Sequence, residues 1–596
     1  MARVFKFRFE QWNFHEGVDP LGSVVCKSIS FDSKVKMSKK FYIGYIILSI
    51  LLSGLFLSGC SSSNGNRSKN ISGNDKSPVS DFVACHKSLK PSEKMLATRI
   101  SDLKSHDWNL QLTLICLQGL VNRKAPCFFV VQDELDEKWL SWMLERGDIK
   151  EIEWISADQV IEKFAPVAQG LVIVDTLIPA TFNTATMLAG INNWLVATPG
   201  AIKKYSLVDK ISKHSENDLL DMRQFHWKKD IEAYRWFYNK YYDQLSHKMC
   251  AMTDPYDLPL RDYFVEFRIP LFWVNEGLDS GEMDFTEGLL MKLPPNIPCL
   301  GWPQADRSPD KGMEEHMGVS LLSEFAKYEV CSGFESVSRA VSNLSVHSGT
   351  TANFKNRVST LPALENKVYI SFIRTDGDGA NFYMDRFRKL WDDTTTHGKF
   401  AIGWQLGPTL CDLMPDVVDW YYKHATPNDY FVNALTGIGY IHEENYAYMY
   451  PADNQKQIWK EYLQISKVYR ERLNLSMLTT FMDMSAEKMA DFSNIGFKGI
   501  FYNYLRTYNT TMNNAVSEVN GIPVFRTIAD AGNSEQLVKD IRLWIPRKRP
   551  AMAYISLSNW VTSLKPVNDA LKELGPEYIA VTPEQLVDLY WKSKKK

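Results

Sequence analysis

The stretch VYISFIRTDGDGANFYMDRF, residues 368–387, runs from an apolar segment into two aspartates separated by one glycine, and then into an amphipathic segment. An apolar run bounded by polar residues predicts a buried strand, and the amphipathic segment predicts a helix. Asp376 and Asp378 therefore stand where a strand ends. Three explanations for them are open: a turn that caps the next helix, a metal site, or a pair of working carboxylates.

The same rhythm continues to the end of the chain. After a polar loop, apolar strand-like segments separated by helix-like ones occur at 368–375, 400–406, 430–436, 475–482, 499–502, 522–528, 551–557 and 578–581. Such a series of seven or eight units predicts a (β/α) barrel, complete or lacking one unit, over residues 360–596. A doubly wound open sheet is the alternative.

The chain before this barrel also has an α/β pattern. We expect an N-terminal α/β domain at 91–205 and a second α/β region at 206–355, which may consist of two small domains. The segments that indicate this are helices at 108–123 and 230–245, strands at 125–133, 169–175 and 265–275, and strand-and-turn segments at 296–306 and 343–349.

Residues 37–60, MSKKFYIGYIILSILLSGLFLSGC, have a basic start, an apolar core and small residues before a cysteine. This order predicts an export signal, and the LSGC ending resembles the bacterial lipoprotein lipobox, in which Cys60 is acylated. We expect a signal peptide at 37–59, a flexible tether at 60–90, and an upstream extension at 1–36. The expected location is the cell envelope, lipid-anchored at the outer membrane on its periplasmic or surface side. A membrane-spanning helix is the alternative.

The composition is that of a folded globular protein, with 45% hydrophobic and 23% charged residues. The formal charge of −2 gives no indication of a nucleic-acid partner. Aromatic residues make up 13% of the chain, which fits large buried cores or platforms for stacking on sugar rings. Oligomeric state leaves no sign in the sequence.

In (β/α) barrels the reactive groups lie where strands end and βα loops begin. The predicted strand exits carry acids, amides, arginines and aromatic residues. We expect carboxylate chemistry from Asp376, Asp378, Glu443, Glu444 and Asp483. We expect substrate contacts from Arg374, Asn381, Trp404, Gln405, Tyr440, His442, Asn503, Arg526, Asn559 and Trp560.

The metal explanation has little support from spacing. DGDGANFYMDRF begins like a calcium loop, but Phe387 stands where that loop requires a glutamate ligand. The last 230 or so residues contain no HxxH or HxxxH pair of the kind that zinc-dependent deacetylases need. We expect no cofactor, while a hard cation such as calcium at Asp376 and Asp378 stays open. Capping of a helix at Ala380 by Asp378 also stays open.

Paired carboxylates are the third explanation. Glycoside hydrolysis uses one protonated and one ionised acid, about 5–5.5 Å apart for retention and about 6.5–9.5 Å apart for inversion. Asp376 or Asp378 on the first strand exit, facing Glu443 or Glu444 on the third, would suit this chemistry.

Four segments resemble the GxGYxYP putative glycoside hydrolases, a family of exported proteins abundant in gut Bacteroidetes. They are LQGLVNR (117–123), the GW…E…NLSVHSG pattern (301–349), RTDGDGAN (374–381) and GIGY (437–440). The resemblance covers about residues 92–596 and implies N-terminal domains, a C-terminal barrel-like domain and a connection with carbohydrate. Ile441 and His442 stand where the family has Tyr-Pro, and a Tyr-Pro pair occurs only at 450–451.

We therefore expect a lipoprotein glycoside hydrolase that acts on an envelope, dietary or host glycan with paired carboxylates at the C-terminal face of the barrel. Its partners are the glycan and, through the lipid anchor, the membrane. Two alternatives are a non-catalytic glycan-binding or scaffolding lipoprotein and a metal-assisted hydrolase of another bond, such as an ester or phosphodiester.

Overall fold

The structure is a computed structural model, which describes residues 90–100, 108–211, 218–275, 280–305, 312–333, 341–347, 354–357, 360–481, 484–502, 515–530, 533–558 and 561–595. All of them belong to the compact unit that spans Lys76–Lys596. Among the expected site residues, Cys60, Asp483, Asn503, Asn559 and Trp560 lie outside the described residues, as do the expected signal peptide and upstream extension. No helix in the described part has both the length and the apolarity needed to cross a membrane.

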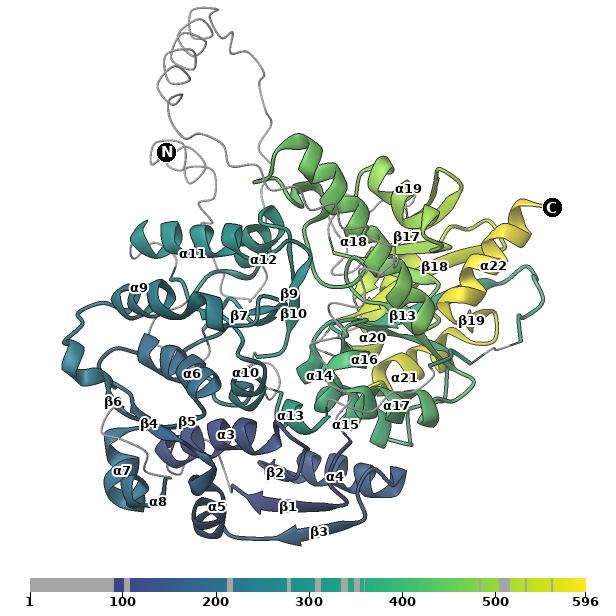
Figure 1. The fold of residues 1–596 in the computed structure, drawn as a ribbon. Coiled ribbons are helices and arrows are strands. Elements are labelled where there is room, and N and C mark those ends of the chain that lie inside the picture. The colour runs from purple at the N-terminus through teal and green to yellow at the C-terminus, as the bar shows by residue number, and fades with distance from the viewer. Residues whose placement is uncertain are drawn as a thin grey trace, which may run out of the picture. The chain divides into compact units, whose positions relative to one another are not determined.

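The C-terminal part of the chain forms a closed barrel of seven parallel strands, in the green and yellow part of Figure 1. Pairing of the first strand with the second, at Phe372 and Ile402, closes the ring. The barrel prediction is therefore confirmed, and the open sheet is wrong. The strands are β11 (Val368–Arg374), β12 (Ile402–Leu406), β13 (Asp429–Asn433), β14 (Met477–Thr480), β15 (Gly499–Tyr502), β17 (Ile522–Asp530) and β18 (Ala551–Leu557).

Two further strands join the barrel wall. The last predicted strand is β19 (Tyr578–Ala580), which pairs with the first half of β11. A strand that we did not predict, β16 (Val516–Val519), forms an antiparallel hairpin with β17. Its turn is Asn520-Gly521, and both residues have positive φ, as such hairpin turns require. The Asn-Gly pair was the sequence signal for this hairpin.

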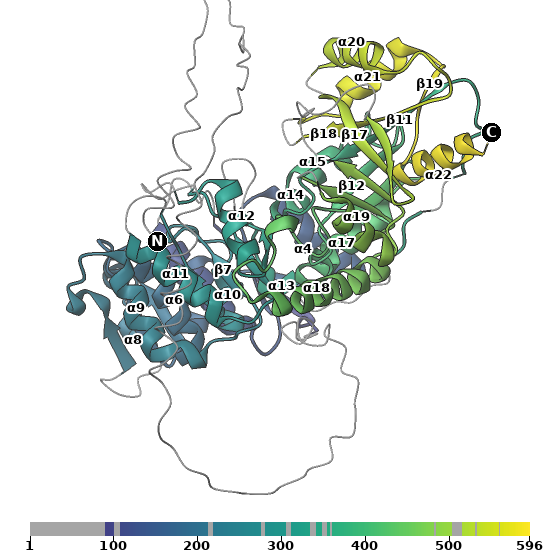
Figure 2. The same ribbon diagram turned by 90° about the horizontal axis from the view of Figure 1, so that it is seen from above.

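Helices surround the barrel, and Figure 2 shows α20 and α21 on one side of the strands with α17 and α18 on the other. Inside, alternate side chains such as Tyr369, Tyr430 and Phe501 form a core that α22 completes through Val587. The helices are α14 (Ala380–Met384), α15 (Arg386–Asp392), α16 (Leu410–Leu413), α17 (Pro415–His424), α18 (Ala452–Arg472), α19 (Ala486–Asn494), α20 (Ser534–Trp544), α21 (Lys565–Leu574) and α22 (Pro583–Lys594).

Three separate parallel sheets precede the barrel. The first contains β1 (Lys94–Arg99), β2 (Phe128–Val131) and β3 (Glu151–Trp154), and the second contains β4 (Gly170–Ile173), β5 (Trp194–Ala197) and β6 (Leu219–Asp221). The third contains β7 (Cys250–Met252), β8 (Leu271–Phe272), β9 (Ile297–Gly301) and β10 (Lys327–Cys331). The boundary that we expected near residue 205 falls inside the second sheet, because β6 pairs with β4.

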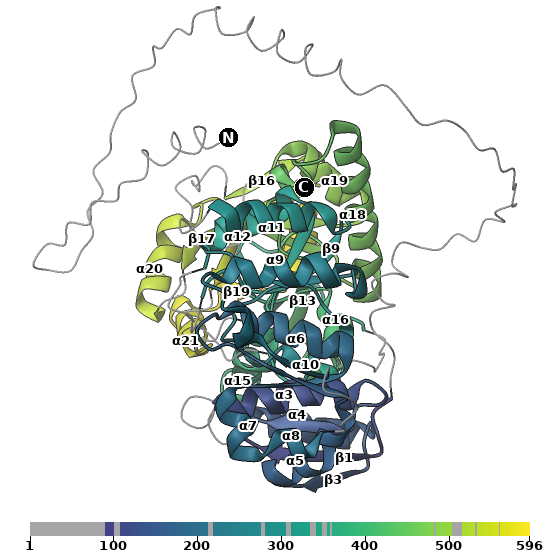
Figure 3. The ribbon, with the colours of Figure 1, turned by 60° about the vertical axis from the view of Figure 1, so that its left-hand side comes forward.

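Helices pack between and around these sheets, and Figure 3 shows α9, α6 and α3 in succession. The helices are α3 (Trp108–Asn122), α4 (Glu134–Arg146), α5 (Ala157–Phe164), α6 (Ala180–Asn192), α7 (Pro199–Tyr205), α8 (Leu207–Lys210), α9 (Asp230–Tyr241), α10 (Arg261–Phe267), α11 (Ser280–Lys292), α12 (Glu315–Glu324) and α13 (Leu344–His347).

One strand prediction in this part is wrong and another is right only in its second half. Residues 343–349 contain helix α13 rather than a strand, and 265–275 begin inside helix α10 and contain strand β8. Both helices are buried almost all round, so they lack the polar face from which a helical period is recognised. The predicted helix at 108–123 is confirmed as α3.

Two of the segments that carry the family resemblance bind each other. In LQGLVNR, the Gln118 amide donates to Asn343 Oδ1 (2.7 Å) and the Asn122 amide donates to Ser345 Oγ (2.9 Å), and both acceptors belong to NLSVHSG. Gly119 lies between them on α3, where a Cβ atom would stand 2.2 Å from the Asp262 carbonyl oxygen of α10. These residues therefore hold the N-terminal helices to the segment that precedes the barrel.

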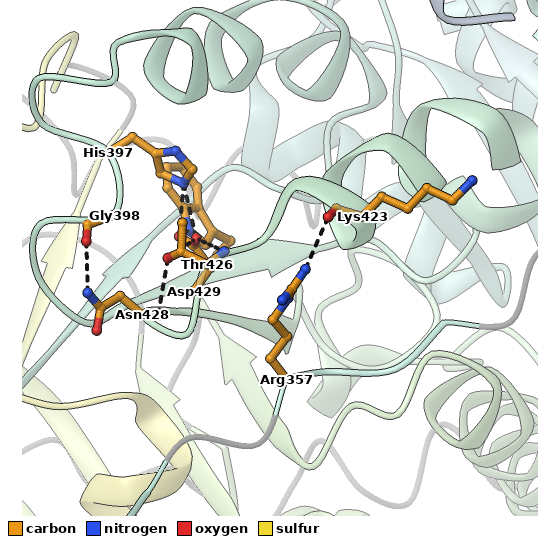
Figure 4. Close-up of polar contacts among 8 residues, drawn as sticks. Arg357, His397, Gly398, Lys423, Thr426, Asn428 and Asp429 are labelled. Atoms are coloured by element: carbon orange, nitrogen blue, oxygen red, sulfur yellow. Dashed lines mark hydrogen bonds and ion pairs between the residues drawn. The ribbon is translucent and has the colours of Figure 1, made fainter. Parts of the chain in front are cut away.

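Trp404 faces outward from β12, away from the barrel interior. It is fully buried between the wall and α15, and its indole Nε1 donates to Asp429 Oδ1 at 2.8 Å. Figure 4 shows the other partners of Asp429: Thr426 Oγ1 donates to Oδ2 at 2.7 Å, and His397 Nε2 lies 3.1 Å from both oxygens. The expectation that Trp404 stacks on a sugar is therefore wrong.

We expect Trp404→Phe to lower the free energy of unfolding by about 2 kcal/mol, because it removes the indole donor from Asp429 and leaves a cavity. Chemical denaturation monitored by circular dichroism measures this change. The matched control is Trp154→Phe at a position that is 41% exposed, where a shift within about 0.5 kcal/mol is expected. Equal stability of the two variants would contradict the structural role of Trp404.

Candidate active site at the barrel mouth

The two aspartates lie on a tight turn that is pressed against the end of β12. Asp376 has a left-handed backbone with φ of 66°, and its Oδ2 accepts a hydrogen bond from Thr375 Oγ1 at 2.6 Å. A Cβ atom on Gly377 would stand 1.8 Å from the Gln405 carbonyl oxygen, so only glycine fits there. The Gln405 side chain accepts from Gly377 N and donates to Thr479 Oγ1 of β14. Gln405 is fully buried and therefore supports the turn rather than contacting substrate, which corrects our expectation for this residue.

Asp378 does not cap the following helix. Helix α14 has Gly379 at its N-cap, and no side chain makes a capping hydrogen bond there. The capping explanation is therefore wrong for Asp378. The side chains of Asp376 and Asp378 are both partly exposed at the carboxyl end of β11.

A third carboxylate joins this pair from another domain. Burial, followed by the negative charges of Asp376 and Glu315, raises the pKa of Asp378 to about 7. Glu315 stands at the start of α12, and burial raises its pKa as well. The charge of Asp376 adds to that rise, while His316 and a hydrogen bond from Tyr440 oppose it. The acids thus affect one another's protonation, although Glu315 lies far from the barrel in sequence.

Beneath them lies a fourth acid, Glu329, in the middle of β10. Its side chain is fully buried, and neither carboxyl oxygen has a hydrogen-bond partner among the described residues. Burial raises the pKa of Glu329 well above the ordinary value. Cys250, Asp378 and Glu315 add smaller effects in the same direction. Glu329 is therefore a buried acid behind the site whose charged form is disfavoured.

The GIGY segment joins the barrel to the third sheet. Glu329 N donates to the Tyr440 carbonyl at 2.9 Å, and Tyr440 N donates to the Glu329 carbonyl at 3.0 Å. A Cβ atom on Gly439 would stand 2.5 Å from the Tyr328 ring, and Gly437 has φ of 100°. The two glycines therefore permit a close approach and a left-handed turn, and Tyr440 is buried with its hydroxyl on Glu315 Oε1 at 3.2 Å.

Aromatic and imidazole rings form one side of this region. The ring centroids of His316 and His442 are 5.8 Å apart, and that of Phe481 is 4.9 Å from His316. Burial and the neighbouring His316 lower the pKa of His442 to about 4, so His442 is neutral at pH 7. The structure thus places the predicted His442 beside two residues that we did not predict.

Glu443 and Glu444, the acids of the loop that follows β13, lie in a different environment from Asp378. Glu443 is buried and accepts from Thr480 Oγ1 at 2.6 Å, and burial raises its pKa to about 7. The charges that act most on Glu443 come from Glu444 and Lys488, whereas those that act on Asp378 come from Asp376 and Glu315. Glu444 is exposed and accepts from Ser485 N at 2.8 Å. The acids grouped with Asp378 are thus Asp376 and Glu315.

Three other residues that we expected to contact substrate make contacts within the protein instead or in addition. Arg374 is fully buried, packs on Phe387 and donates to the carbonyls of Leu557 and Ser558. Asn381 is fully buried, with its Oδ1 3.9 Å from Cys331 Sγ. Our expectation is wrong for these two. Arg526 is partly exposed, donates to Ser517 Oγ and lies over the Tyr502 ring.

Sequence reasoning missed Glu315, His316, Glu329 and Phe481. The first three lie outside the barrel, so no strand exit pointed to them. Across the described residues, no group of three His, Cys, Asp or Glu side chains is arranged to hold a metal ion.

Comparison with known proteins identifies related sequences and one related fold. Residues 168–245 match the second domain of GxGYxYP_N, 247–349 match the GxGYxYP third domain, and 366–591 match the GxGYxYP putative glycoside hydrolase C-terminal domain. No curated protein matches the chain. The crystal structure of a putative hydrolase from Bacteroides thetaiotaomicron VPI-5482 has the same fold, with 18% sequence identity and a TM-score of 0.69. The match covers 85% of this chain and 96% of that one.

We expect Gly439→Ala to weaken the joint between β10 and the GIGY segment, because the added methyl group collides with Tyr328 and the Glu329 carbonyl. The expected loss of stability is about 1–3 kcal/mol. Hydrogen exchange at the amides of Glu329 and Tyr440 should accelerate. As a control, Gly288→Ala on α11 meets no atom within 4 Å and should leave both amides protected. Unchanged exchange in Gly439→Ala would show that the close approach is not required.

Proposed function

Because the chain belongs to the GxGYxYP family of putative glycoside hydrolases, we propose that it hydrolyses glycosidic bonds at the barrel mouth, with Asp378 as the general acid. The observation that carries this proposal is the position of Asp378 beside Asp376 at the carboxyl end of β11, where burial and neighbouring charges raise its pKa to about 7. A glycosidase must give a proton to the leaving oxygen, and an acid with a pKa near 7 still holds its proton in neutral solution.

Burial first, and then the negative charge of Asp376, keep the proton on Asp378. A carboxyl group that is buried beside another negative charge ionises less readily than one in water. The same principle separates acid and base roles in many carboxylate enzymes.

The substrate we propose is a glycan of the envelope, the diet or a host, reached by a protein anchored through Cys60. The support for the anchor is the lipobox-like LSGC sequence after an apolar core, followed by a polar tether. The anchor would hold the barrel close to the membrane.

For the wild-type protein, we expect kcat/KM to fall as pH rises through about 7, because Asp378 then loses the proton that it must donate. Asp376→Asn removes a charge that raises the pKa of Asp378, so this decline should move to lower pH. Asp378→Asn should reduce kcat by about 10²–10⁴-fold. Reducing-end release from a panel of glycans measures each value.

The matched control is Asp569→Asn, a partly exposed position on α21 that pairs with Lys565 and Lys572. It should keep full activity and the same pH profile. A wild-type protein that releases no sugar from any glycan, or an Asp378→Asn variant as active as the wild type, would contradict the proposal.

We expect Cys60→Ala to prevent incorporation of labelled palmitate and to release the protein from the membrane fraction, because acylation requires the cysteine thiol. Cys26→Ala is the control, since this cysteine precedes the expected cleavage site, and it should keep the label. Labelling that persists in Cys60→Ala would contradict the anchor.

A further inference from the structure

Strand β10 of the third sheet lies across the mouth of the barrel. Its Glu329 pairs through the backbone with Tyr440 of the third βα loop, and its Cys331 Sγ lies 3.9 Å from Asn381 Oδ1 after the first βα turn. Helix α12, which precedes β10, contacts the loop at Glu443–Asn445. The third sheet and its helix thus form a wall facing the two aspartates.

Glu315 is the acid that this wall presents. It is partly exposed on the first turn of α12, and its Oε1 accepts the Tyr440 hydroxyl at 3.2 Å. The charge of Glu315 affects the pKa of Asp378, and the charge of Asp376 affects that of Glu315. The hydrogen bond from Tyr440 and the packing of α12 on the third βα loop place the Glu315 carboxyl at the barrel mouth, and its electrostatic effect on Asp378 agrees with this position.

Glycoside hydrolysis requires two carboxyl groups on different sides of the bond that breaks. Asp376 and Asp378 are two residues apart on one tight turn and reach the site from the barrel side. Glu315 comes from the facing domain. Burial raises the pKa of Glu315, and the hydrogen bond that the Tyr440 hydroxyl donates to it opposes that rise by favouring the charged form.

We propose that Glu315 is the ionised carboxylate that works opposite Asp378, so that the active site is assembled from two domains. This proposal rests on the function proposed above. Asp378 gives its proton to the glycosidic oxygen as the bond from C1 to that oxygen breaks, and the bonding electron pair stays with the oxygen. A water molecule forms the new bond to C1, and its proton ends on Glu315. One water is consumed, and solvent exchange restores both carboxyl groups.

The test compares Glu315→Gln with the wild type on two glycosides of the same sugar, one with a poor and one with a good leaving group. Loss of the ionised partner should lower kcat at least 100-fold on both substrates. Asp378→Asn should lose far less on the good leaving group, which needs little protonation. Azide should restore turnover in Glu315→Gln and give the glycosyl azide, because the small anion attacks C1 in place of the activated water.

Glu314→Gln is the matched control, since Glu314 is the exposed N-cap of the same helix and a glutamine oxygen can still accept the hydrogen bond from Met317 N. It should keep kcat within 2-fold. Tyr440→Phe removes only the hydroxyl, which raises the pKa of Glu315 and should move the acidic limb of the pH profile to higher pH. A residue with a purely structural role would lower activity without moving this limb, so Tyr440→Phe tests the proposal even if Glu315→Gln folds poorly.

Two results would overturn the proposal while leaving the proposed function intact. They are a folded Glu315→Gln variant whose kcat stays within 3-fold of an active wild type, and an inactive, folded variant that azide does not rescue. A wild type that is inactive on all glycans would overturn the proposed function and this proposal with it.

Discussion

The two backbone hydrogen bonds between Glu329 and Tyr440 are the contact on which the site depends. They join the outer strand of the third sheet to the third βα loop of the barrel, and they require Gly439 because no side chain fits against Tyr328. With this contact in place, the Tyr440 hydroxyl donates to Glu315, whose charge acts on the pKa of Asp378. The glycines of the family motif therefore allow the barrel and the third sheet to approach each other closely.

The barrel could be predicted because each strand is a short apolar run and the later helices, such as α18, α20 and α21, have a visible polar face. Asp376 and Asp378 followed from the rule that parallel strands end at the same rim. The prediction that Trp404 contacts substrate was wrong, although the sequence of β12 was enough to correct it. Side chains alternate along a strand, and because Gly403 and Gln405 face inward, Trp404 must face outward. Glu315 could not be found this way, because its position at the site depends on how two domains pack. A periodic pattern within one segment of sequence carries no information about such packing.

At neutral pH, the buried carboxyl groups of the site also lower the free energy of unfolding. The folded protein keeps the proton of Asp378 up to about pH 7, whereas an unfolded chain releases it near the ordinary value of 3.8. The contribution of this group to stability therefore falls as pH rises between these two values. Glu329 adds to the effect, because burial raises its pKa in the same direction. The rest of the fold compensates with contacts between domains, such as the Trp139 and Trp142 indoles, which donate to the carbonyls of Met384 and Asp416.

Strand β10 lies at the border of its sheet, with β9 on one side and the Tyr440 segment on the other. Unpaired border strands invite another molecule to add its own strand, which is a common start of aggregation. The Tyr440 segment occupies the amide and carbonyl of Glu329 and thereby blocks such addition at the centre of β10. The contact between the GIGY segment and β10 thus covers part of a sheet edge with which another chain could otherwise pair.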